Sequence, residues 1–490
     1  MMRKGIARGD GGADDAALVA GATVRWGLAG LALTVLLSSL GISIANVGLP
    51  ALAQVFAVPF REVQWVVLAY LLSITTLIVG VGRLGDIVGR RRLLLLGIAL
   101  FTAASALAGA ASSLWMLIAA RAVQGLGAAA MMALATAFVG DAVPKARIGR
   151  AMGLMGTMSA LGTALGPTLG GALIAAFGWP AIFLVTVPPG AAAFLLVRHG
   201  LSADRVEAGG ARGRFDGPGT LILALTLAAY ALAMTGGFGL PVPALLLAAA
   251  GGLGLFLLVE ARTASPLLRL ELLGSRTSGG RISGDRALGG RLLMNMLVAT
   301  VMMATLVVGP FHLSRALGLE AAMVGLAMSA GPVVSALTGV PAGRLVDRFG
   351  TAGMTGLGLA MATVGCVLLA LLPATLGVAG YVGPLVIVTA GYAQFQAANN
   401  TAVMSGLEAD RRGLVSGLLN LSRNLGLVTG ASVMGMVFAL GVGTDAVSAA
   451  PDAVAAGTRM TFAVAAALIA VALAIAWGVL RRAAPPARRG

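Results

Sequence analysis

The chain alternates long apolar runs with short polar joints from residue 27 to residue 480. A helix of about 20 apolar residues spans the hydrocarbon core of a bilayer, and fourteen runs reach that length. Period-two alternation, which marks the strands of a membrane β-barrel, is absent. The pattern therefore predicts an all-α membrane protein with fourteen transmembrane helices, over residues 27–49, 63–82, 93–113, 114–138, 149–176, 179–197, 218–238, 241–259, 289–309, 321–343, 352–373, 381–404, 413–441 and 459–480.

Composition and charge support a membrane location and predict its orientation. Apolar residues make up 58% of the chain and charged residues 11%, far from the composition of a soluble domain. Most of the 34 lysines and arginines lie in the two tails and in alternate joints, so the positive-inside rule predicts cytoplasmic N- and C-termini in a bacterial plasma membrane. The net charge of +16 is therefore spread along the cytoplasmic membrane surface and forms no separate basic domain, so we expect no nucleic-acid partner.

The runs group into two six-helix halves separated by two further helices. The single cysteine, Cys366, cannot form an intrachain disulfide or a multi-cysteine metal site, and we expect no metal or cofactor. The predicted units are a cytoplasmic tail (1–26), an N-terminal six-helix bundle (27–200), cytoplasmic linkers with two extra helices (201–284), a C-terminal six-helix bundle (285–482) and a second tail (483–490).

The joint between the second and third runs is short and heavily charged, and it reads G-R-L-G-D-I-V-G-R-R-R. Gly82 and Gly89 allow two helix ends to come close together, and Asp86 can pair with a basic neighbour. Arg90 and Arg91 anchor the next helix on the positive side of the membrane. We interpret the joint as a conformational latch; the alternative is that its arginines only fix the topology.

This joint matches the pattern G-x-x-x-D-x-x-G-R-[KR]-[KR] and resembles the loop between the second and third helices of the major facilitator superfamily of secondary transporters. The end of the first run, L-G-I-S-I-A-N-V-G-L-P, is similar to the signature L-D-x-T-I-V-N-V-A-L-P of the fourteen-helix drug:proton antiporter branch, with Asn46 and Pro50 in place. The resemblance implies two pseudo-symmetric six-helix bundles plus two inserted helices. In that branch the aspartate serves cation recognition or proton coupling, and this chain has Gly41 in its place.

The fourth run contains an arginine, within L-x-x-x-R-x-x-Q-G-x-G. A charge at the centre of a helix in lipid costs at least ~2.5–3.5 kcal/mol, so Arg121 should face a cavity, a partner or water. The pattern resembles the superfamily's fourth-helix motif, which implies a role in proton transfer or substrate charge for Arg121 and a place beside it for Gln124. The alternative is a structural arginine bonded to backbone carbonyls of neighbouring helices.

The fifth run contains the glycine-rich string G-x-x-x-G-P-x-x-G-G, which resembles the superfamily's antiporter motif and implies export. Glycines four residues apart form a groove in which another helix packs closely, and a proline bends its helix. We interpret the motif as a bending element and a tight helix contact. Its members are Gly162, Gly166, Pro167, Gly170 and Gly171.

The second half repeats the first. The charged joint recurs 261 residues later as G-R-L-V-D-R-F-G, in which Asp347 takes the place of Asp86 and the basic run is lost. Gly426 and Gly430 follow the first two glycines of the antiporter motif by 264 residues, without the proline. Two related halves are typical of a transporter that works by alternating access around a midplane site.

Several polar side chains fall inside apolar runs, where unpaired amides are costly. In the twelfth run they recur at three- and four-residue steps and share one face. We expect them to contact the substrate or the coupling ion; the alternative is hydrogen bonding between helices, which applies to Asn46 as well. The candidates outside the fourth run are Asn46, Asn295, Tyr392, Gln396, Asn399, Asn400, Arg423 and Asn424.

None of the 18 acidic residues is predicted near the middle of a helix. An exporter of cations usually needs a buried acid whose pKa is raised by desolvation. Anionic or neutral amphipathic substrates are therefore more plausible than lipophilic cations. A rim acid such as Asp86 or Glu62, a loop histidine (His199 or His312), or the substrate itself would have to bind the proton.

We expect a secondary active transporter that exports small amphipathic molecules by proton antiport with alternating access, working as a monomer in the lipid bilayer. One alternative keeps the fold and makes the protein an uncoupled or weak-acid exporter. Another makes it a non-transporting membrane sensor. We expect no enzymatic activity, because two loop histidines and one buried cysteine supply neither a nucleophile with its base nor a metal site.

Overall fold

The computed structural model describes residues 11–78, 80–142, 148–201, 216–236, 239–263, 283–404, 409–443, 446 and 448–483. All regular structure in these ranges is helical. The elements are α1 (Gly11–Val55), α2 (Phe60–Val63), α3 (Trp65–Ile78), α4 (Val81–Val88), α5 (Arg90–Gly109), α6 (Leu114–Ala142), α7 (Ile148–Phe177), α8 (Ala181–Leu184), α9 (Val187–Gly200), α10 (Gly217–Met234), α11 (Val242–Arg262), α13 (Ser283–Phe311), the π-helix η3 (His312–Ala316), α14 (Ala321–Phe349), α15 (Thr351–Leu371), the 3-10 turn η4 (Ala374–Leu376), α16 (Gly377–Met404), α17 (Ala409–Thr429), the π-helix η5 (Gly430–Met434), α18 (Gly435–Val442) and α19 (Pro451–Ala483).

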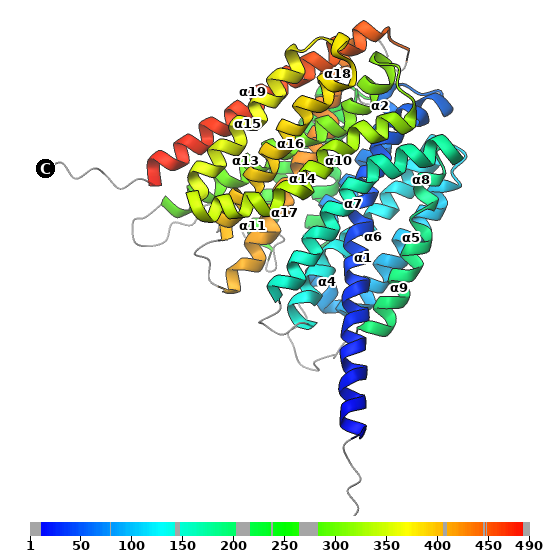
Figure 1. The fold of residues 1–490 in the computed structure, drawn as a ribbon, viewed down its shortest axis with the longest axis vertical. Coiled ribbons are helices and arrows are strands. Elements are labelled where there is room, and N and C mark those ends of the chain that lie inside the picture. Colours follow the sequence, from blue (N-terminus) through cyan, green and yellow to red (C-terminus); the bar gives the residue numbers. More distant parts are fainter. Residues whose placement is uncertain are drawn as a thin grey trace, which may run out of the picture.

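Fourteen helical stretches in the described residues are long and apolar enough to cross a membrane, so the predicted fold class and number of spans are confirmed. We call the end of the molecule with the joints after α1, α5, α7, α10, η3, α15 and α18 the distal end. The opposite end, where α1 begins and α19 ends, is the terminal end. Figure 1 shows the bundle from α1 to α9 and the bundle from α13 to α19 lying together distally and diverging toward the terminal end.

Each bundle is built around one close helix pair. In the first bundle, α1 packs along α7. Gly162 permits this close approach, because a Cβ atom at that position would clash with the Leu36 carbonyl. In the second bundle, α13 packs along α17, and Cβ atoms at Gly426 and Gly430 would meet the carbonyls of Met296 and Thr300. The glycine repeat seen in the sequence is therefore a repeat of the same helix contact in both halves.

The two bundles share an apolar core near the distal end. Val67 of α3 belongs to one buried cluster together with Met303 of α13 and Val428 of α17. Toward the terminal end the buried clusters stay within one bundle: Leu31 and Met131 belong to a cluster of the first bundle, and Val403 and Val415 to a cluster of the second. Contact between the halves is therefore concentrated distally.

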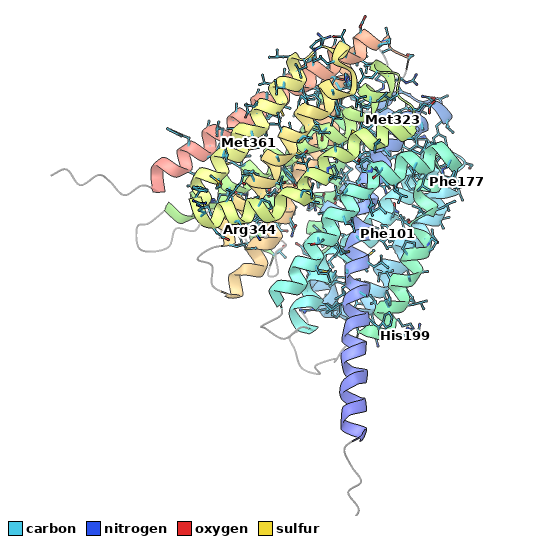
Figure 2. The ribbon with its side chains drawn as sticks, viewed as in Figure 1. Phe101, Phe177, His199, Met323, Arg344 and Met361 are labelled. Atoms are coloured by element: carbon cyan, nitrogen blue, oxygen red, sulfur yellow. The ribbon has the colours of Figure 1, made fainter. Side chains whose placement is uncertain are left out.

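The inserted pair, α10 and α11, packs on itself and on the outside of both bundles. Leu223, Leu227 and Phe256 form its small core, against Leu72 of α3 and Leu425 of α17. Most of the remaining α11 surface is exposed, as expected for a helix that faces lipid. Figure 2 shows His199 at the terminal end of the first bundle and Arg344 at that of the second.

Candidate functional site

Arg121 is completely buried inside the first bundle. Its Nε donates to the Val66 carbonyl of α3 at 2.9 Å, and its Nη2 donates to the Gly41 carbonyl of α1 at 2.9 Å. Its Nη1 donates to Gln124 Oε1 at 2.6 Å. The guanidinium thus ties α6 to two neighbouring helices, which is the arrangement of a structural arginine. A role in coupling or in substrate recognition stays a prediction.

Aromatic rings complete the surroundings of this charge. The Arg121 Cζ lies 4.1 Å from the centroid of the Tyr70 ring and 5.8 Å from that of Phe183. Gln124 Nε2 donates in turn to Ser105 Oγ at 2.7 Å. Among the described residues, the guanidinium has no carboxylate partner. Carbonyl dipoles and π faces therefore stabilise the buried cation.

Tyr70 also fills the space beside Gly41. A Cβ atom at Gly41 would lie 2.8 Å from the Tyr70 hydroxyl oxygen, which itself donates to the Ser38 carbonyl at 2.9 Å. An aspartate at position 41, which the drug:proton antiporter branch has, would displace this hydroxyl. The glycine and the tyrosine therefore form a matched pair in this chain.

The candidate residue of α1, Asn46, is buried and bonds within its own helix. Its Nδ2 donates to the Ile42 carbonyl at 2.7 Å, and its Oδ1 has no hydrogen-bond partner. The structure does not place Asn46 in a bond to another helix. Its Oδ1 remains available as an acceptor, and a substrate contact stays a prediction.

The predicted polar residues of the second bundle do not form one cluster. Asn295 Nδ2 of α13 donates to the Leu419 carbonyl at 3.0 Å and to Ser422 Oγ at 2.8 Å, so it fastens α13 to α17. Gln396 Nε2 donates to the hydroxyl of Tyr392 at 3.0 Å along α16.

Asn399 and Asn400, one turn further along α16, differ in exposure. Asn399 is fully buried, its Nδ2 lies 3.5 Å from the Arg291 carbonyl and its Oδ1 has no partner. Asn400 is exposed.

Arg423 and Asn424 lie on α17 and keep unused donors. Arg423 is half-buried and its Nε has no partner; Asn424 is buried and its Nδ2 has none. Arg423 follows Ser159 of α7 by 264 residues, and Ser159 contacts Ser39 of α1 through their hydroxyls at 2.8 Å. The second bundle therefore places a cation where the first has a neutral contact.

The charged joint of the first bundle adopts a backbone that requires glycine. Gly89, between α4 and α5, has φ +100°, and Gly350, between α14 and α15, has φ +81°. The two joints thus repeat in conformation as well as in sequence. Asp347 is exposed on α14, and Gly82 is exposed with nothing within 4 Å of a Cβ atom there.

The predicted latch contacts are only partly described. The side chain of Asp86 lies outside the described residues, so its pairing stays a prediction. Arg91 Nη2 donates to the Arg198 carbonyl at the end of α9, which holds the joint to its own bundle. The Arg90 side chain lies beside Gly85, with its Cγ 3.2 Å from a Cβ atom there.

The antiporter-motif glycines face two different helices. Cβ atoms at Gly166 and Gly170 would meet Ser43 and Val47 of α1. Gly171 faces α14 of the other bundle, where a Cβ atom would meet the Ala321 carbonyl and lie 2.9 Å from Gly325 Cα.

The backbone of Pro167 also contacts the other bundle. Its carbonyl oxygen lies so close to Gly325 of α14 that a Cβ atom at Gly325 would clash with it. The motif is therefore a contact between the two halves as well as within one.

A second contact between the halves joins Gln64, between α2 and α3, to α18. A Cβ atom at Gly435 would meet the side-chain amide of Gln64, whose Nε2 is buried without a partner. Next to it, the ring of Phe60 contacts those of Phe311 and Phe438, with centroids 4.6 Å and 5.2 Å away. We call the two contacts, Gly171 with Gly325 and Gln64 with Gly435, together with this aromatic triad, the distal seam.

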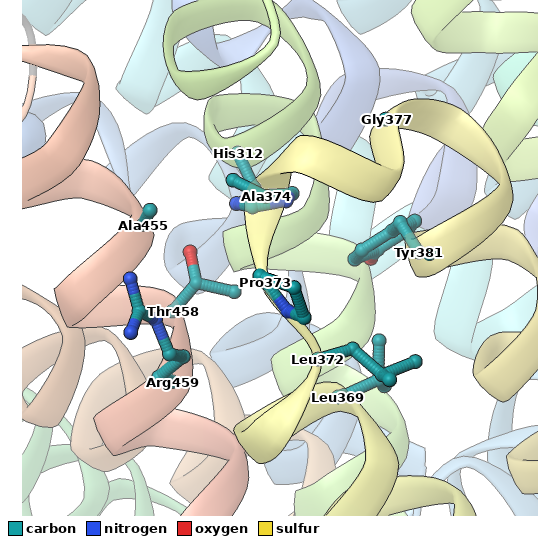
Figure 3. Close-up of a pocket in the computed structure, with 11 residues that line it drawn as sticks. His312, Leu369, Leu372, Pro373, Ala374, Gly377, Tyr381, Ala455, Thr458 and Arg459 are labelled. Atoms are coloured by element: carbon teal, nitrogen blue, oxygen red, sulfur yellow. The ribbon is translucent and has the colours of Figure 1, made fainter.

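Two cavities of very different size lie at the distal end. One, between η3, α16 and α19, has a volume of about 20 Å³ and is lined by His312, Tyr381 and Arg459 among others (Figure 3). It holds little more than a single water-sized group, so it is too small for an amphipathic substrate. The other, about 490 Å³, is lined by Arg61, Glu62, Thr235, Gly236 and Gly239.

The family model of the Major Facilitator Superfamily matches residues 31–431 and 292–490, which cover nearly the whole chain. The chain belongs to this superfamily.

Its relatives within the superfamily include named drug exporters. The chain is 30% identical over 410 residues to the multidrug resistance protein Stp of Mycobacterium tuberculosis, covering 81% of this chain and 72% of that one. It is 30% identical over 417 residues to the multidrug efflux pump LfrA of Mycolicibacterium smegmatis, covering 84% and 80%. It is also 28% identical over 407 residues to the riboflavin transporter RibZ of Clostridioides difficile, covering 83% and 86%.

Solved superfamily structures share the fold. A bacterial homologue of the human lysosomal transporter Spinster, in an inward-facing and unoccupied conformation, aligns with TM-score 0.68 at 15% identity, covering 95% of this chain and 99% of that one. A POT family transporter in complex with 5-aminolevulinic acid aligns with TM-score 0.70 at 15% identity, covering 92% and 96%. At this identity the likeness concerns the fold.

Sequence reasoning missed the distal seam, although the internal repeat of this superfamily member contained the signal. The offset of 264 residues that relates the glycine motifs also relates Gly171 to Gly435. The offset of 261 residues that relates the charged joints also relates Gln64 to Gly325. The two seam contacts are thus pseudo-symmetric copies: once Gly171 is known to meet Gly325, the two offsets give Gln64 and Gly435 as the matching pair.

Proposed function

We propose that this superfamily member exports small amphipathic molecules from the bacterial cytoplasm by alternating access, in exchange for protons. It works as a monomer in the plasma membrane, with both termini in the cytoplasm and the distal end outside. The observation that carries this proposal is the pair of pseudo-symmetric contacts at the distal seam. A seam that closes one end of two related bundles is what alternating access requires of an inward-facing state.

The inward-facing assignment has further support. The two bundles diverge toward the terminal end (Figure 1), and the buried clusters nearest that end each hold residues of one bundle. The Spinster homologue with the same fold was solved in an inward-facing conformation. The substrate would enter from the cytoplasm, and the seam would open to release it.

The chemistry of the spans favours anionic or neutral amphipaths. Among the described residues of the fourteen spans, carboxylates occur only at span ends, at Glu62, Glu260 and Asp452. Arg423 instead offers an unused Nε in a half-buried position. A cation with spare hydrogen-bonding capacity attracts a carboxylate, a sulfonate or an electron-rich ring. The names of Stp, LfrA and RibZ support drugs or small metabolites as cargo.

An uncoupled exporter on the same fold is the second candidate, and Tyr70 favours it. Its hydroxyl fills the space where the branch's aspartate would begin, so this chain lacks that proton-binding group. A weak acid that leaves as its anion needs no protonatable site on the protein. Proton exchange would otherwise depend on Glu62 or Asp86. We propose no metal or cofactor beyond the proton in either case.

The test uses purified protein in sealed liposomes with an imposed pH gradient and a trapped pH-sensitive dye. Panels of matched cationic, neutral and anionic amphipaths are added, and both dye signal and solute uptake are recorded. Gradient discharge by anionic or neutral compounds supports the proposal. Solute flux without discharge favours the uncoupled exporter, and discharge by cations alone contradicts the charge argument. No flux of any compound would favour a sensor.

A further inference from the structure

The larger distal cavity, of about 490 Å³, lies between α2 and the joint that connects α10 to α11. Its described lining residues are Arg61, Glu62, Thr235, Gly236 and Gly239. A volume of this size falls within the range of about 300–1,000 Å³ that is usual for small-molecule sites. The cavity can therefore hold a whole molecular group, and not only a water molecule or a single ion.

The cavity offers one positive and one negative side chain. Arg61 Nη1 lies 3.6 Å from the position that a Cβ atom at Gly236 would take, so the guanidinium lies against the α10–α11 joint. Glu62 is half-buried on the same turn of helix. Within the described part of the chain, neither side chain forms an ion pair. Both charges are therefore available to a ligand.

Thr235 adds a hydrogen-bond acceptor to this lining. Its hydroxyl donates to the Ala231 carbonyl at 2.9 Å and accepts from Trp65 Nε1 at 3.1 Å. A hydroxyl has one hydrogen and two lone pairs, so one lone pair remains for a donor on a ligand. The cavity thus presents acceptors at Glu62 and Thr235 and donors at Arg61.

These groups favour a ligand that carries both signs of charge. Glu62 would repel a simple anion and Arg61 would repel a metal ion, for which one carboxylate also supplies too few oxygen ligands. A phosphate binds a guanidinium well, and a primary ammonium has three N–H donors for a carboxylate and a hydroxyl. The matching chemistry is a phosphate and a primary ammonium within one small group.

The cavity lies at the level of the lipid headgroups. The second span begins at Phe60, the seventh ends at Met234 and the eighth begins at Val242, so the lining residues lie where spans leave the hydrocarbon. Just after the lining residues in the chain, Leu240 and Leu247 are exposed and offer apolar surface to acyl chains. A lipid headgroup is therefore a better match than a free solute of the same charge.

We propose that this cavity binds the headgroup of a phosphatidylethanolamine molecule at the distal membrane surface. Arg61 binds the phosphate, and Glu62 and Thr235 bind the ammonium. The bound lipid joins α2 to the inserted pair, so it stabilises the folded protein against unfolding. This inference needs only the membrane placement of the spans, and it holds or fails independently of transport direction and proton coupling.

The experiment measures lipid binding to the full-length protein in detergent by native mass spectrometry, with the shift in unfolding temperature as a second readout. The probes are dioctanoyl phosphatidylethanolamine, dioctanoyl phosphatidylcholine and soluble phosphoethanolamine. We expect the ethanolamine lipid to bind about tenfold more tightly than the choline lipid, because a trimethylammonium has no N–H donor. Soluble phosphoethanolamine should bind more weakly than the lipid, because it lacks the acyl chains. Equal affinity for the two lipids, or for the ethanolamine lipid and phosphoethanolamine, would overturn the proposal.

Two substitutions separate the roles of the charged residues. Glu62→Gln keeps the size of the side chain and removes its charge, so it should weaken binding of the ethanolamine lipid about tenfold and that of the choline lipid much less. Arg61→Gln should weaken both lipids by the same factor, because both carry the phosphate. An ethanolamine preference that survives Glu62→Gln, or unchanged binding in Arg61→Gln, would overturn the proposal.

Matched controls remove charges elsewhere at the distal end. Arg459→Gln and Asp452→Asn change exposed residues of α19, and neither should alter the affinity for either lipid. A loss in these variants equal to that in Arg61→Gln or Glu62→Gln would mean that overall charge sets the affinity, which would overturn the proposal. The comparison of the three probes on the unsubstituted protein decides the question even if a variant fails to fold.

Discussion

Gly171 and Gly325 meet backbone to backbone across the distal seam, with no side chain between them. The pseudo-symmetric contact replaces one of these glycines by Gln64, whose amide lies on Gly435. A backbone cannot move aside, whereas a side-chain amide can adopt another rotamer. The two seam contacts are therefore related by symmetry but differ in how readily they yield.

This difference predicts unequal effects of adding one methyl group. Gly171→Ala forces a clash with the backbone of α14 and should destabilise the closed seam by about 1–3 kcal/mol, with loss of most transport. Gly435→Ala meets only the Gln64 amide, so its effect on transport should be clearly smaller. Gly156→Ala has open space and serves as the control. Equal losses in Gly171→Ala and Gly435→Ala would show that the seam yields alike at both contacts.

The backbone of the charged joint gives a second prediction. Gly89→Ala puts a Cβ atom on a residue with φ +100° and should destabilise the protein by about 1–3 kcal/mol in thermal unfolding. Gly350→Ala, at φ +81°, should behave in the same way. Gly82→Ala is the matched control in the same joint, because its Cβ atom meets nothing within 4 Å. A neutral Gly89→Ala would mean that the joint has another backbone in solution.

We expect substitution of Arg121 to lower the stability of the fold, and transport to fall as a consequence. Arg121→Gln removes donors from the carbonyls of Val66 and Gly41, and hydrogen bonds to a charged group contribute about 1.5–3 kcal/mol each. We expect a large fall in unfolding temperature in detergent, with Arg121→Lys intermediate because an ammonium cannot reach both carbonyls and Gln124. Unchanged thermal stability together with lost transport would instead indicate that the residue acts in coupling.

Sequence reasoning predicted the spans and the close helix pairs well, for physical reasons. Span length follows from bilayer thickness, and glycines four residues apart have few uses other than close packing. It could not predict which way a polar side chain points, because most faces of a membrane helix are apolar and periodicity then reports no rotation. Arg121 and Asn295 accordingly turned out to bond to neighbouring helices.

The packing of the inserted helices could not be predicted for a different reason. Leu223 and Leu227 are two more apolar positions within their run, and their neighbours Leu72 and Leu425 lie on helices far away in the sequence. Such contacts are tertiary, and only the arrangement of the helices reveals them.

The matched pair of Gly41 and Tyr70 predicts how cation selectivity could be introduced. Gly41→Asp alone should impair folding, because its Cβ atom would lie 2.8 Å from the Tyr70 hydroxyl oxygen. Gly41→Asp combined with Tyr70→Phe frees that space and sets a carboxylate close to Arg121. We expect the pair to fold better than the single variant and to let cationic amphipaths discharge a pH gradient. Tyr70→Phe alone is the control, and cation transport by it would contradict this reasoning.

Arg423 gives the prediction that bears most directly on substrate charge. Its Nε is unused and its side chain is half-buried, so Arg423→Gln should cost little stability and remove the only described cation of α17 within its span. Transport of anionic amphipaths should fall at least about tenfold, the equivalent of one charge-assisted hydrogen bond, while neutral compounds should be much less affected. Arg423→Lys retains the charge and should restore part of the anionic flux. An equal loss for both classes of compound would place Arg423 in the transport machinery rather than in substrate recognition, and unchanged anionic flux would contradict the proposed substrate class.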